Sequence, residues 1–174
     1  IGSLIVGCLD DAGVEVGRLS GIAVGMGPGP FTGLRVGIAA ANAFALGAGK
    51  PVWRVVSHDA VAFGFFASGG DGPLVVTTDA RRREIYWSAY SGCDEFFLPI
   101  RVSGPGLLRP EALASELADY GSYQRKDCDW VSAASVGLLA ESLAAQGGKF
   151  ADPSPLYLRS PDVTLSAGPK RVTA

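Results

Sequence analysis

The sequence predicts an α/β fold with two lobes, and three observations support this prediction. Short apolar strands alternate with helices in the first half of the chain, which is typical of α/β folds. A β-hairpin followed by helices occupies the second half, as in an α+β unit. The segment SGGDGP at 68–73 has the composition of a linker between the two halves. We therefore expect an N-terminal lobe at 1–70 and a C-terminal lobe at 73–174, with a cleft between them.

Apolar runs and their end signals mark the elements of the first half. Residues 1–9 resemble the C-terminal part of a helix that Gly13 ends, although two aspartates there oppose the helix dipole. A helix over about 33–47 is favoured by its alanines and ends at the glycines that follow. Ser57 is a good N-cap for a second helix, at 58–68. The two expected strands that precede these helices span 19–24 and 51–57.

The second half contains a hairpin and several weaker signals. Pro110 suits the first turn of an amphipathic helix over 109–120, and Ser132 caps a helix that ends near Gly147. The polar segment 121–130 is expected to be irregular, and the tail from Asp152 is rich in Pro and Ser. The expected strands span 74–78, 84–90 and part of 95–103.

Composition restricts the class of protein. The chain has 174 residues, 48% of them hydrophobic and 18% charged, with a formal net charge of -2, so overall charge predicts no attraction to nucleic acid or membrane. Cys8, Cys93 and Cys128 have no metal-ligand spacing and are expected to be ordinary buried thiols in a reducing, cytoplasmic setting. No apolar run reaches the length of a membrane span, so we expect no membrane partner. Since the cysteines lack metal-ligand spacing and the chain has one histidine, we also expect no metal site.

The turn GMGPGPFTGLRVG, 25–37, raises two alternatives. It lies between a strand and a helix, the context of a phosphate-binding loop. However, Pro28 and Pro30 lack N–H donors and no lysine follows, so we interpret the turn as a stiff connection and keep phosphate binding as the alternative. On the first reading, the phosphate or nucleotide contacts would be Gly27, Gly29, Thr32, Gly33, Asp79 and Arg81.

Two other groups of residues invite chemical readings. His58 is the only histidine, and at a helix start beside an aspartate it is expected to cap the helix or face solvent. Arg81, Arg82 and Arg83 stand at the hairpin turn, where a solvated turn and a contact with phosphate both remain open. The sequence contains no pair of histidines for a metalloprotease and no G-x-S-x-G nucleophile motif.

Four blocks of the sequence resemble one family. GIAVGMGPGPFTGLRVGIAAANAFA, PVWRVVSHDAVA, TTDARRREIYWSAY and PLYLRSPDV are similar in content and order to the TsaB (YeaZ) family of bacterial tRNA threonylcarbamoyladenosine biosynthesis proteins, in an actinobacterial-like version. The resemblance implies an actin-like, two-lobed fold of the sugar kinase and Hsp70 superfamily (ASKHA). It also implies a non-catalytic partner of TsaD, the subunit that modifies the adenosine beside the tRNA anticodon.

The resemblance implies an interface as well. In this family the first two helices contact the TsaD-like subunit. The helix at 1–9 and the helix at 33–47, whose residues are mostly Ala and Gly, would therefore form a heterodimer interface. A TsaE-like ATPase joins that complex and tRNA binds through it. For the isolated protein, a homodimer and a monomer both remain open. ATP or ADP would bind only at the level of the complex, and no cofactor is expected on this chain. The interface residues would be Leu4, Ile5, Leu34, Gly37, Ile38, Ala41 and Ala45.

This sequence departs from the family pattern in two places. The family begins with a strand and an Asp-Thr-Ser loop that would precede Ile1, and it often has a glycine-rich loop near 121–130. A sheet without its first strands would expose an edge, so we expect an N-terminal segment to precede Ile1 in the full protein.

The alternative function is an actin-like enzyme that binds ATP between the lobes, near 27–32 and Asp79.

Overall fold

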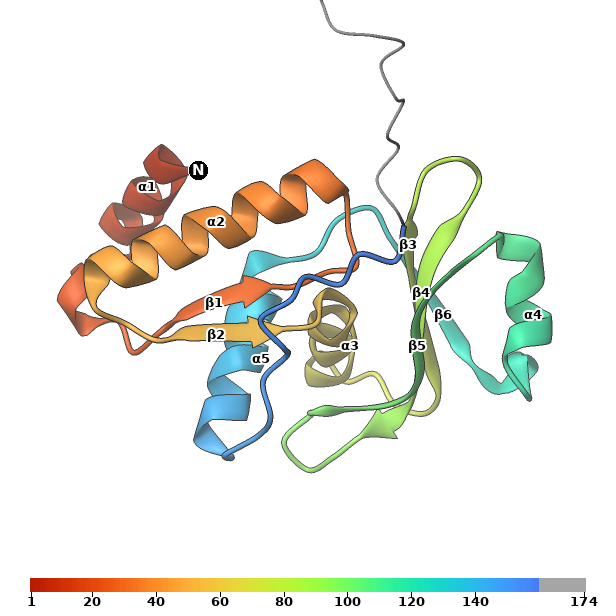
Figure 1. Cartoon of the computed structure of the whole chain (residues 1–174). Coiled ribbons are helices and arrows are strands. Elements are labelled where there is room, and N and C mark those ends of the chain that lie inside the picture. Colours follow the sequence, from red (N-terminus) through yellow and green to blue (C-terminus); the bar gives the residue numbers. More distant parts are fainter. Residues whose placement is uncertain (160–174) are drawn as a thin grey trace, which may run out of the picture.

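A computed structural model describes residues 1–159 and shows an α/β fold with two sheets (Figure 1). The first sheet has two parallel strands, β1 (Ile22–Gly25) and β2 (Val52–Val55), in the register Ile22 to Val52. The second has four strands in the order β5-β4-β3-β6. The α/β class predicted from the sequence is confirmed, whereas the division into two lobes at 70–73 stays a prediction.

Helices cover both faces of the small sheet. α1 (Gly2–Ala12) and α2 (Phe31–Ala48) lie on one side, and α5 (Ala133–Ala145) lies on the other (Figure 1). The strand expected at 19–24 begins at Ile22, and the short 3₁₀ turn η1 (Val16–Arg18) precedes it. The helix ends follow the predictions, because Gly13 and Gly49 both adopt the left-handed conformation that closes a helix.

α3 (Ser57–Ala67) lies between the two sheets and joins their cores. One face contacts α5, where Phe63 packs with Leu139. The other face contacts the four-stranded sheet, where Phe66 packs with Leu74 and Tyr90. The two hydrophobic clusters are therefore connected through a helix that is apolar on all sides, as expected for a buried helix.

The four-stranded sheet is built on the predicted hairpin. β3 (Leu74–Asp79) pairs antiparallel with β4 (Ile85–Cys93), and β4 pairs antiparallel with β5 (Pro99–Leu108). β6 (Gln124–Cys128) pairs parallel with β3, so the prediction that 121–130 is irregular is wrong.

The helix expected at 109–120 is replaced by shorter pieces on the far side of this sheet. They are the 3₁₀ turn η2 (Pro110–Ala112), the single turn α4 (Leu113–Glu116) and the 3₁₀ turn η3 (Tyr120–Ser122). Leu113 and Leu117 pack against Trp87, which fixes α4 over the outer face. The last four residues of the PLYLRSPDV block, 160–163, lie outside the described part of the chain.

Candidate functional site

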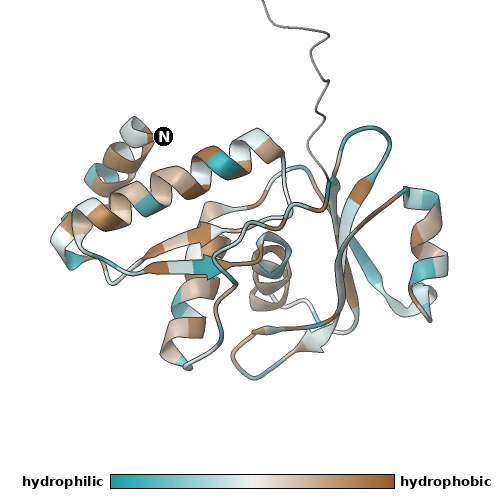
Figure 2. Cartoon of the chain, in the orientation of Figure 1, coloured by the Kyte–Doolittle hydropathy of each residue, from teal (hydrophilic) through white to brown (hydrophobic). Residues whose placement is uncertain are grey.

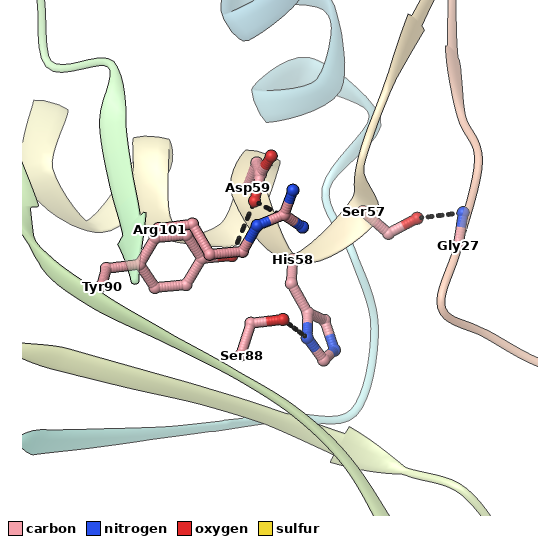
Figure 3. A network of polar contacts seen from close by, with 7 residues as sticks. All are labelled: Gly27, Ser57, His58, Asp59, Ser88, Tyr90 and Arg101. Atoms are coloured by element: carbon pink, nitrogen blue, oxygen red, sulfur yellow. Dashed lines mark hydrogen bonds and ion pairs between the residues drawn. The ribbon is translucent and has the colours of Figure 1, made fainter. Parts of the chain in front are cut away.

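The GMGPGPFTGLRVG turn is held by backbone contacts on the inside of the fold. The N–H of Gly27 donates to the Ser57 hydroxyl at 3.1 Å, and the N–H of Ser57 donates to the Gly27 carbonyl at 2.7 Å (Figure 3). Gly27 has a φ of 98°, and a Cβ there would lie 3.1 Å from the Leu156 carbonyl oxygen. The turn therefore needs a glycine at this position and fixes the start of α2 against α3.

Two predictions about this turn need correction. Ser57 is not the N-cap of α3 but its first residue, since Val56 is the cap and the Ser57 hydroxyl accepts from Gly27 instead. Because that contact already uses the Gly27 N–H, Gly27 offers no donor to a phosphate. α2 begins at Phe31, two residues earlier than expected, and its N-cap Pro30 makes no side-chain cap.

His58 is fully buried, which contradicts the expected capping or solvent-facing role. Its Nδ1 lies 2.9 Å from the Ser88 hydroxyl and its Nε2 lies 2.9 Å from the Thr78 hydroxyl, so both ring nitrogens have partners on the hairpin. Burial, aided by Arg101, lowers the pKa of His58 from 6.5 to about 3. The ring is therefore neutral, and one nitrogen donates while the other accepts.

A second polar group lies beside His58 in the same layer. Asp59 accepts from the Tyr90 hydroxyl at 2.9 Å and lies 3.5 Å from the Arg101 guanidinium (Figure 3). Burial raises the pKa of Asp59 even though Arg101 and Tyr90 act in the opposite direction. Burial and Asp59 together raise the pKa of Tyr90 well above its ordinary value. These contacts connect α3 to β4 and β5.

The pairing of His58 with Ser88 does not form a hydrolase site. Ser88 is 0% exposed, so no substrate reaches its hydroxyl, and Asp59 contacts Tyr90 and Arg101 rather than the imidazole. In residues 1–159 no group of three or more His, Cys, Asp or Glu side chains is placed to hold a metal ion. The polar layer therefore holds the two sheets together through α3.

The residues predicted for a partner interface lie on different sides of α1 and α2. Leu4 is 71% exposed on α1, whereas Ala45 is 2% exposed and packs inside the fold, contrary to the expectation that it faces a partner. Leu34 and Ile38 are half-buried. The remaining three, Ile5, Gly37 and Ala41, line an apolar groove of about 430 Å³ between α1, α2 and β1.

The outward face of α2 is a separate, fully exposed stripe. Its residues recur at the spacing of one helix face and are Thr32, Val36, Ala39, Ala43 and Leu46. Val36 is 51% exposed and Leu46 is 85% exposed, and on α1 Val6 is 57% exposed. Figure 2 shows that hydrophobic residues recur along α1 and α2. Exposed apolar side chains grouped on one helix face are typical of a surface that another protein covers.

The glycines of α2 are not required by packing within this chain. A Cβ built on Gly33, Gly37 or Gly47 would meet no atom of residues 1–159 within 4 Å. Glycine inside a helix costs about 1 kcal/mol relative to alanine, so these positions reduce helix stability without an internal packing gain. They leave room for another chain to approach the backbone of α2.

α2 is also long and apolar enough to meet the composition of a membrane span, which the sequence analysis did not expect. It has 18 residues with a mean hydropathy of 1.3, and 11% of them are buried. However, α2 packs on β1 and β2, and the Nε of Arg35 donates to the Tyr157 hydroxyl at 2.9 Å. We treat its exposed apolar surface as a contact with protein.

Three of the six candidate phosphate contacts come together. Gly29, Thr32 and Arg81 line a cavity of about 520 Å³ between the start of α2, the β3–β4 turn and residues 156–159. Asp79 instead accepts from the N–H of Arg81 at 2.8 Å and pairs with the Arg81 guanidinium at 3.3 Å, so it stabilises the turn. Gly27 and Gly33 do not line the cavity.

The cysteines differ in burial from the expectation. Cys8 is exposed on α1, and Cys93 and Cys128 are half-buried, so none of the three is a fully buried thiol. All three are free in the structure.

Comparisons with known proteins identify the family. Residues 1–99 match the family model described as TsaD: tRNA N6-adenosine threonylcarbamoyltransferase. The TsaB protein of Haemophilus influenzae is 30% identical over 156 residues, which cover 86% of this chain and 64% of that protein. Escherichia coli TsaB is 29% identical over 159 residues, covering 91% and 63%. The chain belongs to the TsaB (YeaZ) family.

Further relatives agree with this assignment. An uncharacterized protein of Mycobacterium tuberculosis is 38% identical over 168 residues, covering 91% of this chain and 72% of that protein. The structure of YeaZ from Pseudomonas aeruginosa superposes with a TM-score of 0.70 at 26% identity and covers 86% of this chain and 79% of that one. A second Pseudomonas aeruginosa structure, described as similar to peptidase YEAZ, has a TM-score of 0.74 at 24% identity and shows the shared fold.

Proposed function

We propose that this TsaB-family protein is a non-catalytic scaffold subunit in tRNA threonylcarbamoyladenosine biosynthesis. In this proposal it binds and activates a TsaD-type catalytic subunit in the cytoplasm, and a TsaE-type ATPase joins the assembly. The observation that carries the proposal is the exposed apolar surface of α1 and α2, in which Leu4 and Leu46 are more than two-thirds exposed. The Escherichia coli and Haemophilus influenzae relatives, both tRNA threonylcarbamoyladenosine biosynthesis proteins, indicate the pathway.

The contact surface consists of the outward stripe of α2 together with Leu4 and Val6 of α1. The open space above Gly33 and Gly47 lets a partner helix approach the backbone closely. Burying these side chains removes apolar area from water, which stabilises association by roughly 25 cal/mol per Å² before the entropic costs of binding. In this proposal the isolated protein can homodimerise through the same surface, since Leu4 and Leu46 are exposed there.

A non-catalytic role agrees with the chemistry of the buried polar layer. The pKa of His58 is lowered to about 3 and both its nitrogens are occupied, so it cannot exchange protons with a substrate near neutral pH. Its contacts serve to align α3 with β3 and β4. The reaction would therefore take place on the TsaD-type subunit.

The proposal is tested by placing a charge on the outward stripe. Val36→Arg and Ala43→Arg should weaken binding to the TsaD-type subunit by about 100-fold or more, because each buries an unpaired guanidinium in an apolar interface. Binding is measured by co-purification and by titration calorimetry. The matched control is Ala114→Arg, on an exposed position of α4 at the opposite end of the molecule.

All three variants should retain the circular dichroism and melting temperature of the parent protein, since their side chains point to solvent. Unchanged affinity of Val36→Arg and Ala43→Arg for the TsaD-type subunit would remove α2 from the interface. Failure of the parent protein to bind any TsaD-type subunit would contradict the scaffold function itself.

A further inference from the structure

The tip of the β3–β4 hairpin and the residues beside it carry a cluster of arginines. Five arginines gather there in a protein whose formal net charge is -2, and two carboxylates of the described residues each pair with one of them. The carboxylates are Asp79, paired with Arg81, and Glu84, paired with Arg159. Arg35 joins the group through its hydrogen bond to Tyr157. The arginines are Arg35, Arg81, Arg82, Arg83 and Arg159.

Backbone conformation makes three of these arginines unexpected. Arg81, Arg82 and Arg83 have φ values of 63°, 56° and 60°, so three successive bulky residues adopt the left-handed conformation. Hairpin turns of this hand normally contain Asn and Gly, which adopt it with little strain. The turn therefore carries charge at positions where folding alone favours other residues, and such strain is common at functional sites.

A cavity with an aromatic wall lies beside this charge. The cavity of about 520 Å³ has the size of a small-ligand site, and Tyr157 at its edge is 39% exposed. The rings of Phe31 and Tyr157 lie 5.0 Å apart, and the guanidinium of Arg35 lies 4.2 Å from the centre of the Phe31 ring. An exposed ring such as that of Tyr157 next to arginine side chains is typical of sites for unpaired nucleotides.

The geometry points to an RNA-binding site formed by the β3–β4 turn, the start of α2 and residues 156–159. Arg81, Arg82 and Arg83 contact backbone phosphates, and the cavity receives one unstacked base against Tyr157. This inference rests on the proposed function, because that function supplies RNA as the polyanion. An acidic peptide would use the arginines but would leave the aromatic cavity empty.

The decisive variant removes charge and strain together. Arg82→Asn with Arg83→Gly replaces two arginines by the residues that the turn prefers, so the melting temperature should stay the same or rise. The affinity for RNA should fall at least about tenfold, and the slope of log affinity against log salt should become shallower by about 1 to 2. A merely structural role for these arginines predicts no loss of RNA affinity.

The probe is a fluorescein-labelled RNA stem-loop of about 17 nucleotides, which presents single-stranded bases, and fluorescence anisotropy of the full chain gives the affinity. The matched control is Arg18→Asn with Arg109→Asn, which removes two exposed charges elsewhere and should leave RNA affinity unchanged.

Thr32→Asp tests the same cavity from α2, where a carboxylate at a helix start does not impair folding but repels phosphate. It should weaken RNA binding as well.

Several results would overturn the inference. They are unchanged RNA affinity in the turn variant and in Thr32→Asp, tighter binding of a poly-glutamate peptide than of RNA, and displacement of RNA by micromolar ATP, which would identify a mononucleotide site. The measurement uses this protein alone, so it is independent of binding to a TsaD-type subunit. A protein that binds that subunit but not RNA would refute this inference and leave the proposed function standing.

Discussion

Two regions of this molecule reverse the usual distribution of polar and apolar groups. Between α3 and the four-stranded sheet, His58 and Ser88 are both buried, with exposures of 0%. On α1 and α2, large apolar side chains face outward, and Leu46 is 85% exposed. In the described residues, every buried side-chain nitrogen or oxygen has a hydrogen-bond partner, so the polar region is complete within the chain.

The contrast separates architecture from interaction. A buried polar group whose hydrogen-bond partners are all present has no hydrogen bond left to form with a ligand. The layer around His58 therefore has a structural role, which is to align the two sheets. An exposed apolar side chain has no partner in the chain, so the α1–α2 surface gains free energy only when another molecule covers it. Unusual chemistry in the interior is therefore a poor guide to function here, and the plain surface is a better one.

The largest effect should come from titration of the buried region. Since His58 has a pKa of about 3 in the folded protein and about 6.5 when unfolded, its contribution to stability is complete above pH 6.5 and is lost as the pH falls toward 3. The free energy of unfolding should drop by about 2 kcal/mol between pH 7 and about pH 5, and by about 5 kcal/mol over the whole window. Urea unfolding at each pH measures this.

The control is His58→Gln, which retains a donor and an acceptor but does not titrate. It should be less stable than the parent at pH 7 and should lose the slope between pH 7 and 5, because His58 is the only histidine. Asp59 acts in the opposite direction, since its raised pKa adds stability as the pH falls through that pKa. An equal slope in the parent and His58→Gln would show that the imidazole is not buried in solution.

A matched pair of leucines compares the two regions directly. Leu139 is 2% exposed in the cluster between α5 and α3, whereas Leu46 is 85% exposed. Leu139→Ala should lower the free energy of unfolding by about 3 kcal/mol through lost contacts and a cavity, and Leu46→Ala should change it by no more than about 0.5 kcal/mol. Chemical denaturation of the isolated protein gives both values.

The order should invert when binding to a TsaD-type subunit is measured. Leu46→Ala should weaken that complex by several-fold, since it removes contact area that lies outside the fold. Leu139→Ala should leave the affinity of the folded fraction unchanged. A large stability loss in Leu46→Ala would mean that the outward face of α2 is covered within the chain itself.

The sequence predicted elements whose signals are local. Ser132 accepts from the N–H of Ser135 as the expected cap, and the alanine-rich run does form α2. The prediction from sequence failed for β6. Its residues, Gln124 to Cys128, have low strand propensity and no alternation of polar and apolar side chains. That strand forms because β3 offers a free edge and because the Thr77 hydroxyl donates to Asp127, which are tertiary contacts.

The prediction for His58 failed for a different reason, although a signal was present. The helix that follows is apolar on all sides, and such a helix is buried even in its first turn. Which faces of α1 and α2 point outward depends on how α2 sits on β1, and no periodicity in a run of alanines and glycines determines that. Ala45, expected at an outward face, is therefore buried, and the exposed Val36 and Leu46 were not among the predicted residues.

The last prediction concerns two glycines, one within α2 and one in the turn that precedes it. Gly37 lies in the middle of α2, lines the groove against β1, and has no atom within 4 Å of the place where a Cβ would stand. Gly37→Ala should therefore raise the free energy of unfolding by about 1 kcal/mol, since it reduces the entropy of the unfolded chain and improves helix propensity. Gly27→Ala is the contrasting control, because its φ of 98° and the nearby Leu156 carbonyl make any side chain destabilising. Thermal unfolding of both variants measures the difference.

If Gly37→Ala proves destabilising, the groove is closed in solution and α2 packs on β1 more tightly than its exposure indicates. If it stabilises the isolated chain but weakens the complex with a TsaD-type subunit, the glycine serves the partner rather than the fold.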